Sequence, residues 1–307
     1  MEPALFDRYF TASLALGLGA CTASNAQTEP SPPSFSQAVS PEQWAQGCEP
    51  WDDWDKPALP FRVHGNTYYV GTCGIASILV VTEEGNVLID SGTERGADVV
   101  IENISHLGVD PAAITTLLHS HEHFDHIGGM GFLEEHTGAQ IWASPLAALV
   151  MINRNVLPED PQFGMHDPMR EITNVEIMSE GRRVDFPGGL TSISTPGHSP
   201  GALSWFWESC EGSVCKTIVY ADSLSPVSSD DYRFSDHPEY LAAYREGLAN
   251  LAALECDILL TPHPSHSRMV ERAATGTFEG GMTCTEYANG KITDIEARLT
   301  REAGANP

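Results

Sequence analysis

The chain has 307 residues, of which 41% are hydrophobic, so it can bury the core of one large domain or two small ones. Its 16 basic residues face 42 acidic ones, which gives a formal net charge of −26 at pH 7. Such a charge repels phosphate backbones and anionic membrane surfaces, and it therefore argues against nucleic acid as a substrate.

The N-terminal residues differ in composition from the rest of the chain. An apolar run over 12–20 is too short to span a bilayer, and the small residues that end at Ala20 and Ala26 are typical of secretory cleavage sites. We therefore expect residues 1–26 to be a signal peptide, although its first residues carry more acidic than basic charge. Cys21 stands in a context that resembles a bacterial lipobox. Cleavage before it, with attachment of a lipid anchor, is the alternative to simple removal.

The next residues, 27–44, are rich in Pro and Ser and predict a flexible N-terminal segment. The folded domain is then expected over 45–303.

Cysteine usage supports export. Processing at Cys21 would leave six of the seven cysteines, and an even number suits a disulfide framework. The expected bridges are Cys210–Cys215, Cys48–Cys73 and Cys256–Cys284. Sequence alone allows fifteen pairings of six cysteines, and buried free thiols in a cytosolic enzyme are the alternative. No pair has the spacing of a zinc finger.

Strand and helix patterns then alternate along the chain, which predicts an α/β fold. β-branched or aromatic runs predict strands over 67–71, 75–82, 86–90, 114–120, 140–143, 190–195, 217–221 and 257–261. Apolar residues at helical spacing predict helices over 97–107, 130–137 and 239–254.

The chemistry of the chain is concentrated directly after the strand expected over 114–120. Four of the 12 histidines fall within 119–126, in the order His-Ser-His-Glu-His-Phe-Asp-His. Residues two apart in an extended chain point the same way, so His121 and His123 can bind one ion together. Asp125 and His126 would then face a neighbouring ion. Mixed imidazole and carboxylate ligands suit zinc with a position open for water.

Two further histidines occupy rigid turns at strand ends. His198 lies within Thr-Pro-Gly-His-Ser-Pro-Gly, and His263 lies within Thr-Pro-His-Pro. A single histidine is more often structural than a ligand. Because Pro and Gly fix these two turns where strands end, we expect both histidines to be preorganised for a metal site.

Together the three motifs resemble those of the metallo-β-lactamase superfamily, over about residues 45–300. The aromatic segment 51–54, the run Tyr-Ala-Asp-Ser-Leu-Ser over 220–225 and the six cysteines are most similar to the third subclass of class B β-lactamases. The resemblance implies a four-layer αβ/βα sandwich, with two similar halves in one domain. It also implies two Zn²⁺ ions, the first held by His121, His123 and His198, and the second by Asp125, His126 and His263.

For this family, the implied reaction is hydrolysis of the β-lactam amide bond of penicillins, cephalosporins and carbapenems by a metal-bridging hydroxide. Asp125 would orient that hydroxide, and Ser223 and Ser225 would hold the carboxylate of the substrate. Simple turn hydroxyls are the alternative for these two serines. Asp222 is expected to be structural, although many superfamily hydrolases bridge two metals with an aspartate near this position. Asp90 is expected to support the metal loop, and Glu122 to face solvent or support the ligands.

Two other functions stay open. A hydrolase of the same fold could act on lactones or thioesters, and a periplasmic metal-binding protein without catalysis is a less favoured reading. We expect a periplasmic monomer with a small-molecule substrate, without a nucleic-acid partner or a transmembrane segment.

Overall fold

The computed structural model describes residues 37–178 and 184–304, which lie in one compact unit. The signal peptide expected over 1–26 and its Cys21 lie outside the described residues. Within the described ranges, no helix is long and apolar enough to cross a membrane.

The larger of two sheets has seven strands in the order β1-β2-β3-β4-β5-β6-β7. Neighbours from β1 to β4 pair antiparallel, and those from β4 to β7 pair parallel. The strands are β1 (Phe61–His64), β2 (Thr67–Tyr69), β3 (Ile78–Val80), β4 (Asn86–Ile89), β5 (Ile114–Leu118), β6 (Gln140–Ala143) and β7 (Val175–Ile177). The central strands β3 and β4 are buried on both faces, which explains their almost continuous apolar sequence.

The smaller sheet has four strands in the order β11-β10-β9-β8, with β10 and β11 parallel and the other pairs antiparallel. Its strands are β8 (Thr191–Ser194), β9 (Leu203–Glu211), β10 (Val214–Tyr220) and β11 (Ile258–Leu260). Side chains alternate between its two faces, and both faces are buried at the centre. Ile218 packs toward the larger sheet, whereas the next residue, Val219, packs toward helices.

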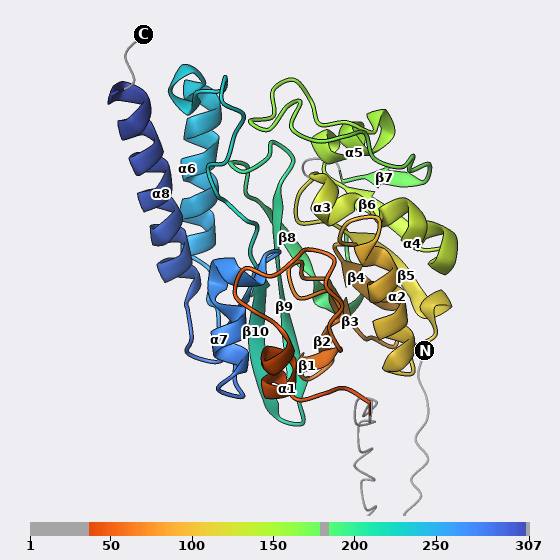
Figure 1. Ribbon diagram of the computed structural model, residues 1–307. Helices are drawn as coiled ribbons and strands as arrows, with labels where there is room; N and C mark the ends of the chain where they lie inside the picture. The colour runs from red at the N-terminus through yellow and green to blue at the C-terminus, as the bar shows by residue number, and fades with distance from the viewer. Residues whose placement is uncertain (1–36, 179–183, 305–307) are drawn as a thin grey trace, which may run out of the picture. The chain divides into compact units, whose positions relative to one another are not determined.

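Helices cover the outer face of each sheet (Figure 1). The α-helices of the described residues are α1 (Pro41–Gly47), α2 (Gly96–His106), α3 (Phe124–Ile127), α4 (Met130–Thr137), α5 (Pro145–Asn153), α6 (Pro238–Ala252), α7 (Met269–Ala273) and α8 (Cys284–Gly304), and of these α1 and α7 contribute side chains to the cluster between the sheets. Helices α2, α4 and α5 pack on the seven-stranded sheet, and α6 and α8 pack on the four-stranded sheet. The layers are therefore helix, sheet, sheet and helix, which confirms the predicted αβ/βα sandwich.

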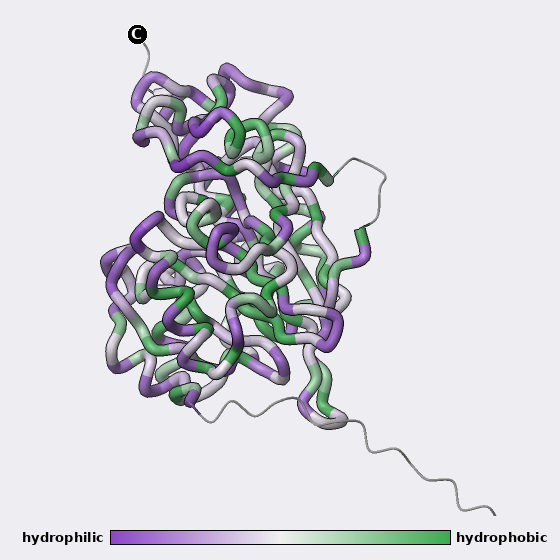
Figure 2. Tube along the Cα trace, turned by 90° about the vertical axis from the view of Figure 1, so that its right-hand side faces the viewer, coloured by the Kyte–Doolittle hydropathy of each residue, from purple (hydrophilic) through white to green (hydrophobic). Residues whose placement is uncertain are grey.

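Three apolar clusters hold these four layers together. Trp205 and Trp207 of β9 pack with Ile78 and Ile89 between the sheets. A second cluster joins the seven-stranded sheet to α2, α4 and α5, and a third joins the four-stranded sheet to α6 and α8. In Figure 2, hydrophobic and hydrophilic stretches alternate along the chain, as elements with one buried side and one exposed side require.

The ordered chain begins before the domain boundary that the sequence predicts. Helix α1 starts at Pro41, inside the segment 27–44 expected to be flexible, and Trp44 is only 2% exposed. Ser40 caps this helix: its hydroxyl accepts a hydrogen bond from the Gln43 backbone, and the Gln43 side chain binds the Ser40 backbone in return. The prediction of flexibility is therefore wrong for 37–44, because a capping box and a buried indole stabilise the helix.

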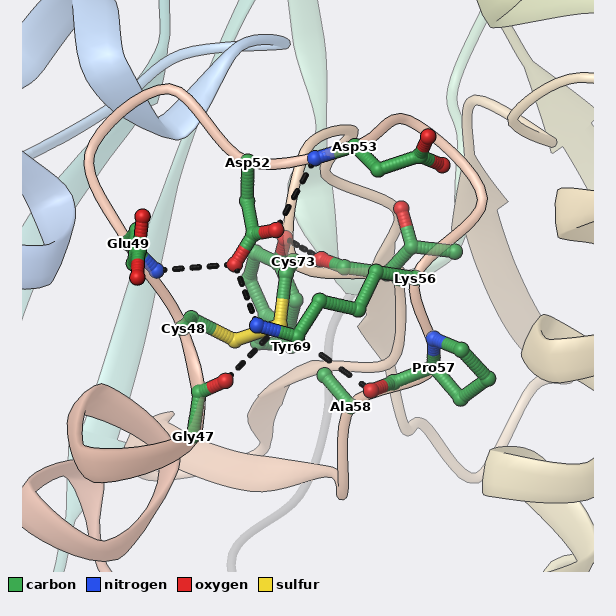
Figure 3. Close-up of a disulfide and its surroundings, with 12 residues drawn as sticks. Gly47, Cys48, Glu49, Asp52, Asp53, Lys56, Pro57, Ala58, Tyr69 and Cys73 are labelled. Carbon is green, nitrogen blue, oxygen red and sulfur yellow. Dashed lines mark hydrogen bonds and ion pairs between the residues drawn. A yellow bond between two sulfur atoms is a disulfide. The ribbon is translucent and has the colours of Figure 1, made fainter.

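The structure joins the cysteines in the expected pairs, Cys48–Cys73, Cys210–Cys215 and Cys256–Cys284. Figure 3 shows the first bridge, which ties the residue after α1 to the turn after β2. Beside this bridge, the Asp52 carboxylate accepts hydrogen bonds from the Glu49 and Asp53 backbones and from Nζ of Lys56. The bridge and these bonds fix the loop over 49–56.

Candidate metal centre

The strand β5 delivers the histidine-rich segment to one edge of the seven-stranded sheet. After Leu118 the chain leaves the strand, and His123 is the last residue before the short helix α3. His121, His123, Asp125 and His126 are all at most 5% exposed. A solvated polar loop would not bury four polar side chains, so their burial supports a ligand role.

The first predicted set of ligands is brought together. Ligand atoms of His121, His123 and His198 all lie within 4.8 Å of one another. Nδ1 of His123 lies 3.3 Å from Nε2 of His198. Nε2 of His121 is buried and has no hydrogen-bond partner among the described residues. Three converging ring nitrogens, one of them unpartnered, fit a tetrahedral metal with one position left for water.

The second predicted set is also brought together. Oδ2 of Asp125 lies 3.0 Å from Nε2 of His126 and 3.3 Å from Nε2 of His263. The two Nε2 atoms lie 3.3 Å apart. The rings of His121 and His126 have centroids 4.1 Å apart, so the two triads adjoin. This donor set fits a second metal ion beside the first.

The electrostatics of the centre also suit a cation. Burial, together with the neighbouring histidines, holds the pKa of His121 and of His198 well below the usual histidine value. Burial raises the pKa of Asp125, but His126 and His263 outweigh burial and keep it well below its usual range. Neutral imidazoles and an ionised carboxylate are the forms that bind metal. Burial lowers the pKa of His123 and of His126, but neighbouring carboxylates outweigh burial and raise both values, that of His126 to about 10, so a metal ion would displace a proton from these two rings.

Each histidine of the first triad is held from behind by an oxygen. Nε2 of His123 lies 3.1 Å from the Asp160 carboxylate, and Nδ1 of His198 donates to the carbonyl of Ser225 at 2.8 Å. Nδ1 of His121 hydrogen-bonds with the Ser120 hydroxyl at 3.2 Å and also lies 2.9 Å from Oδ1 of Asp222. Such contacts fix the tautomer and the orientation of a ligand ring. The expectation that Asp222 has a structural role agrees with this position behind His121.

Asp90 supports the metal loop as expected. Its carboxylate accepts hydrogen bonds from the backbone and hydroxyl of Ser120 and from the hydroxyl of Tyr220, at 2.6–2.8 Å. It also lies 3.4 Å from Nδ1 of His126. Asp90 thus joins the ends of β4, β5 and β10.

Glu122 is fully buried, which excludes the first of its two expected positions, facing solvent, and agrees with the second, a support of the ligands. Its carboxylate accepts hydrogen bonds from the Ser199 hydroxyl at 2.5 Å and from the Gly201 backbone at 2.6 Å. Both donors follow His198 in the chain. Glu122 therefore ties the turn that carries His198 to the segment that carries His121.

Ser223 and Ser225 follow Asp222 and lie next to the first triad. The hydroxyl of Ser223 is buried and has no hydrogen-bond partner within the part of the chain that the structure describes. The hydroxyl of Ser225 accepts a hydrogen bond from Nζ of Lys291 at 2.7 Å and donates one to the carbonyl of Ser223. A carboxylate role for either serine stays a prediction.

A tryptophan-bearing loop borders the second triad. The ring of Trp54 lies 5.8 Å from that of His263, and the ring of Trp51 lies 5.9 Å from that of His266. The loop packs so closely that a Cβ at Gly74 would lie 2.6 Å from a carbonyl oxygen of the loop, so only glycine fits there. Trp51 itself is 78% exposed. An exposed indole beside the centre provides an apolar surface for a ligand.

Sequence reasoning does not identify Asp160 or Lys291. Asp160 follows Glu159 in an irregular segment, and nothing in the sequence separates the buried acid from its exposed neighbour. Lys291 belongs to a long hydrophilic helix in which most charged residues face water.

Comparisons with known proteins agree with this geometry. The family model of the metallo-beta-lactamase superfamily matches residues 70–263. The solved structure of the MIM-2 metallo-beta-lactamase is 51% identical, with a TM-score of 0.81 over 87% of this chain and 100% of that one. MIM-1 from Novosphingobium pentaromativorans is 41% identical, with a TM-score of 0.82 over 87% and 99%. The N-acyl homoserine lactonase of Bacillus thuringiensis is 28% identical over 46% of this chain and 61% of its own. The chain belongs to the metallo-beta-lactamase superfamily.

Proposed function

We propose that this protein hydrolyses the β-lactam amide bond of penicillins, cephalosporins and carbapenems with two zinc ions. The observation that carries the proposal is the pair of adjoining triads, His121, His123 and His198 beside Asp125, His126 and His263. Bound zinc supplies a water that ionises near neutral pH and a Lewis acid for the carbonyl oxygen. The similarity to MIM-2 and MIM-1 over 87% of the chain supports β-lactams as the substrate class.

The residues of the chain have separate tasks in this reaction. Asp125 orients the attacking water, since its carboxylate converges with the ring nitrogens of His126 and His263 on one point, at 3.0 and 3.3 Å from them. Ser223 and Ser225 hold the carboxylate of the substrate. The exposed Trp51 contacts the apolar part of the antibiotic. The reaction needs no acyl-enzyme, so bulky substituents on the antibiotic should slow it little.

We further propose that the protein is exported to the periplasm as a monomer, with residues 1–26 removed or a lipid attached at Cys21. The three disulfides support an oxidising compartment.

An assay with a carbapenem and an N-acyl homoserine lactone in parallel tests the function. We expect rapid opening of the carbapenem and slow or no opening of the lactone. Selective opening of the lactone would overturn the proposal. It would favour lactone hydrolysis, the reaction for which the similar N-acyl homoserine lactonase of Bacillus thuringiensis is named. The position of Asp222 behind His121, 2.9 Å from its Nδ1, supports the first outcome. In that position Asp222 contacts a ring of the first triad, and its other carboxylate oxygen accepts a hydrogen bond from the Leu224 backbone.

A further inference from the structure

Helix α8 buries a lysine beside the candidate metal centre. Lys291 is 8% exposed, and its Nζ donates a hydrogen bond of 2.7 Å to the hydroxyl of Ser225. A hydroxyl does not neutralise an ammonium. The carboxylate of Asp294 lies 3.8 Å away, and its side chain is 54% exposed, so this ion pair is largely screened by water. Burial lowers the pKa of Lys291, and the charges of Asp294 and Asp222 offset this effect only in part, so a buried ammonium at this position is costly.

The charge of Lys291 is close to the residues of the centre. The Ser225 hydroxyl accepts from Lys291, and the Ser225 carbonyl accepts from Nδ1 of His198. One residue thus connects the ammonium to a ligand ring of the first triad. Lys291 therefore lies beside the first triad.

The helix holds Lys291 in a fixed position. The hydroxyl of Tyr287, one turn earlier, donates to the carbonyls of Asp222 and Ser223 at 2.9 and 2.8 Å. The ammonium of Lys291 also lies 5.2 Å from the centre of the Tyr287 ring. The disulfide Cys256–Cys284 anchors the first residue of α8. A cation fixed in this way is preorganised for a ligand, because little side-chain freedom is lost on binding.

The net charge of the protein makes a local cation useful. With a formal charge of −26, the protein repels anions in general. A β-lactam with a free carboxylate is an anion, and the zinc ions of the proposed function would attract it at the two triads. The buried ammonium at Ser225 supplies a second, separate positive charge where the substrate carboxylate would bind.

We propose that Lys291 is a specificity-determining residue that selects substrates with a free carboxylate by placing a positive charge at the hydroxyl of Ser225. This inference rests on the proposed β-lactam hydrolysis. The Ser225 hydroxyl turns its one hydrogen from the Ser223 carbonyl to the substrate carboxylate, and the ammonium behind the hydroxyl stabilises the bound negative charge. The carboxylate is retained throughout ring opening, so Lys291 stabilises the bound substrate and the transition state alike.

The test compares one β-lactam as the free acid with its methyl ester, in the wild type and in K291Q. We expect K291Q to raise KM for the acid by roughly tenfold or more, which is the ordinary value of a charged hydrogen bond, with kcat nearly unchanged. KM for the ester should be the same in both proteins. K291R should restore most of the affinity for the acid. The matched control is R245Q, which removes a cation from an exposed ion pair with Glu296 of α8 and should leave both KM values unchanged.

Each outcome either supports or overturns the proposed role of Lys291. If K291Q raises KM for acid and ester equally, Lys291 only supports the loop and the inference is wrong. An unchanged KM for the acid overturns it as well. If K291Q does not fold, K291M takes its place, because a methionine side chain fills similar buried space without charge. A wild type that opens neither compound overturns the proposed function and this inference with it.

Discussion

The carboxylate of Asp160 lies 3.1 Å from Nε2 of His123, and both side chains are buried. The other ring nitrogen of His123, Nδ1, faces His198 within the first triad. The backbone N–H of Gln162 donates to the same carboxylate at 2.7 Å and fixes its position. Asp160 therefore sets which nitrogen of His123 is free to bind metal.

We expect Asp160→Ala to weaken zinc binding at the first triad by roughly 10–100-fold, because the ring loses the acceptor that orients it. Titration of zinc against a competing chelator measures the change. The control is Glu159→Ala, which removes an exposed carboxylate one residue away. Equal zinc affinity in the two variants would show that the contact with His123 is incidental.

Loss of a ligand from each triad should separate the two zinc sites. Purified wild-type protein should carry two zinc ions per chain, and chelation should abolish activity. His121→Ala should lose zinc from the first triad, and His263→Ala from the second, because each lost ligand lowers affinity steeply. Metal analysis by mass spectrometry counts the ions. His136→Ala serves as the control, since His136 is exposed and binds only the Phe132 carbonyl of its own helix. Iron in the wild type, or one zinc ion with both triads intact, would contradict this prediction.

The six metal ligands could be predicted because each lies in a motif that is short in the sequence. Four of the six lie within six residues, and the other two occupy rigid Pro/Gly turns at strand ends. Asp160 and Lys291 could not be predicted, because only tertiary packing distinguishes them from exposed acids and lysines. The position of Asp222 behind His121 likewise depends on how β10 meets β5.

The helices and strands likewise differ in how well the sequence predicts them. The helix α4 and the strand β6 were predictable to the residue, because their apolar periodicity is regular and clear turn residues bound them. The strand β9 was not, because Ser204 is buried and disturbs the apolar alternation: its hydroxyl hydrogen-bonds with Thr195 and with the Asp222 backbone. The helix α8 was not predicted either. Its buried side includes Cys284, Tyr287, Ala288 and Ile295, but the buried Lys291 and the many charged residues of the helix interrupt this apolar stripe.

The disulfides should contribute unequally to stability. Cys256–Cys284 closes a loop with a sequence separation of 28, whereas Cys210–Cys215 closes one of 5 within the β9–β10 hairpin. In the chain-entropy description, removal of the longer bridge costs roughly 3.5 kcal/mol and removal of the shorter one roughly 2 kcal/mol. Denaturant unfolding of the two double Cys→Ser variants, at one fixed zinc concentration, measures the difference. A larger loss from the short bridge would contradict the prediction, and free thiols in a non-reducing peptide map would also rule out these pairings.

Ser223 and Ser225 are the residues proposed to hold the substrate carboxylate. Their hydroxyls differ in setting: that of Ser225 is bound to Lys291, and that of Ser223 is buried without a partner in the described chain. If both hold the substrate carboxylate, replacement of both by alanine should raise KM for a carbapenem roughly tenfold or more and lower kcat by less. The carboxylate does not react, so its contacts are equal in the ground state and the transition state, and their loss appears in KM.

Steady-state kinetics of both single variants and of the double variant measure this effect. Ser213→Ala, in the exposed turn between β9 and β10, is the control. Wild-type kinetics in the double variant would exclude the serines from substrate binding, although the zinc chemistry could stand. We also expect that the wild-type protein does not hydrolyse a monobactam. A loss confined to kcat would instead mean that these hydroxyls act on charge that develops during ring opening, because only an interaction absent from the ground state leaves KM unchanged.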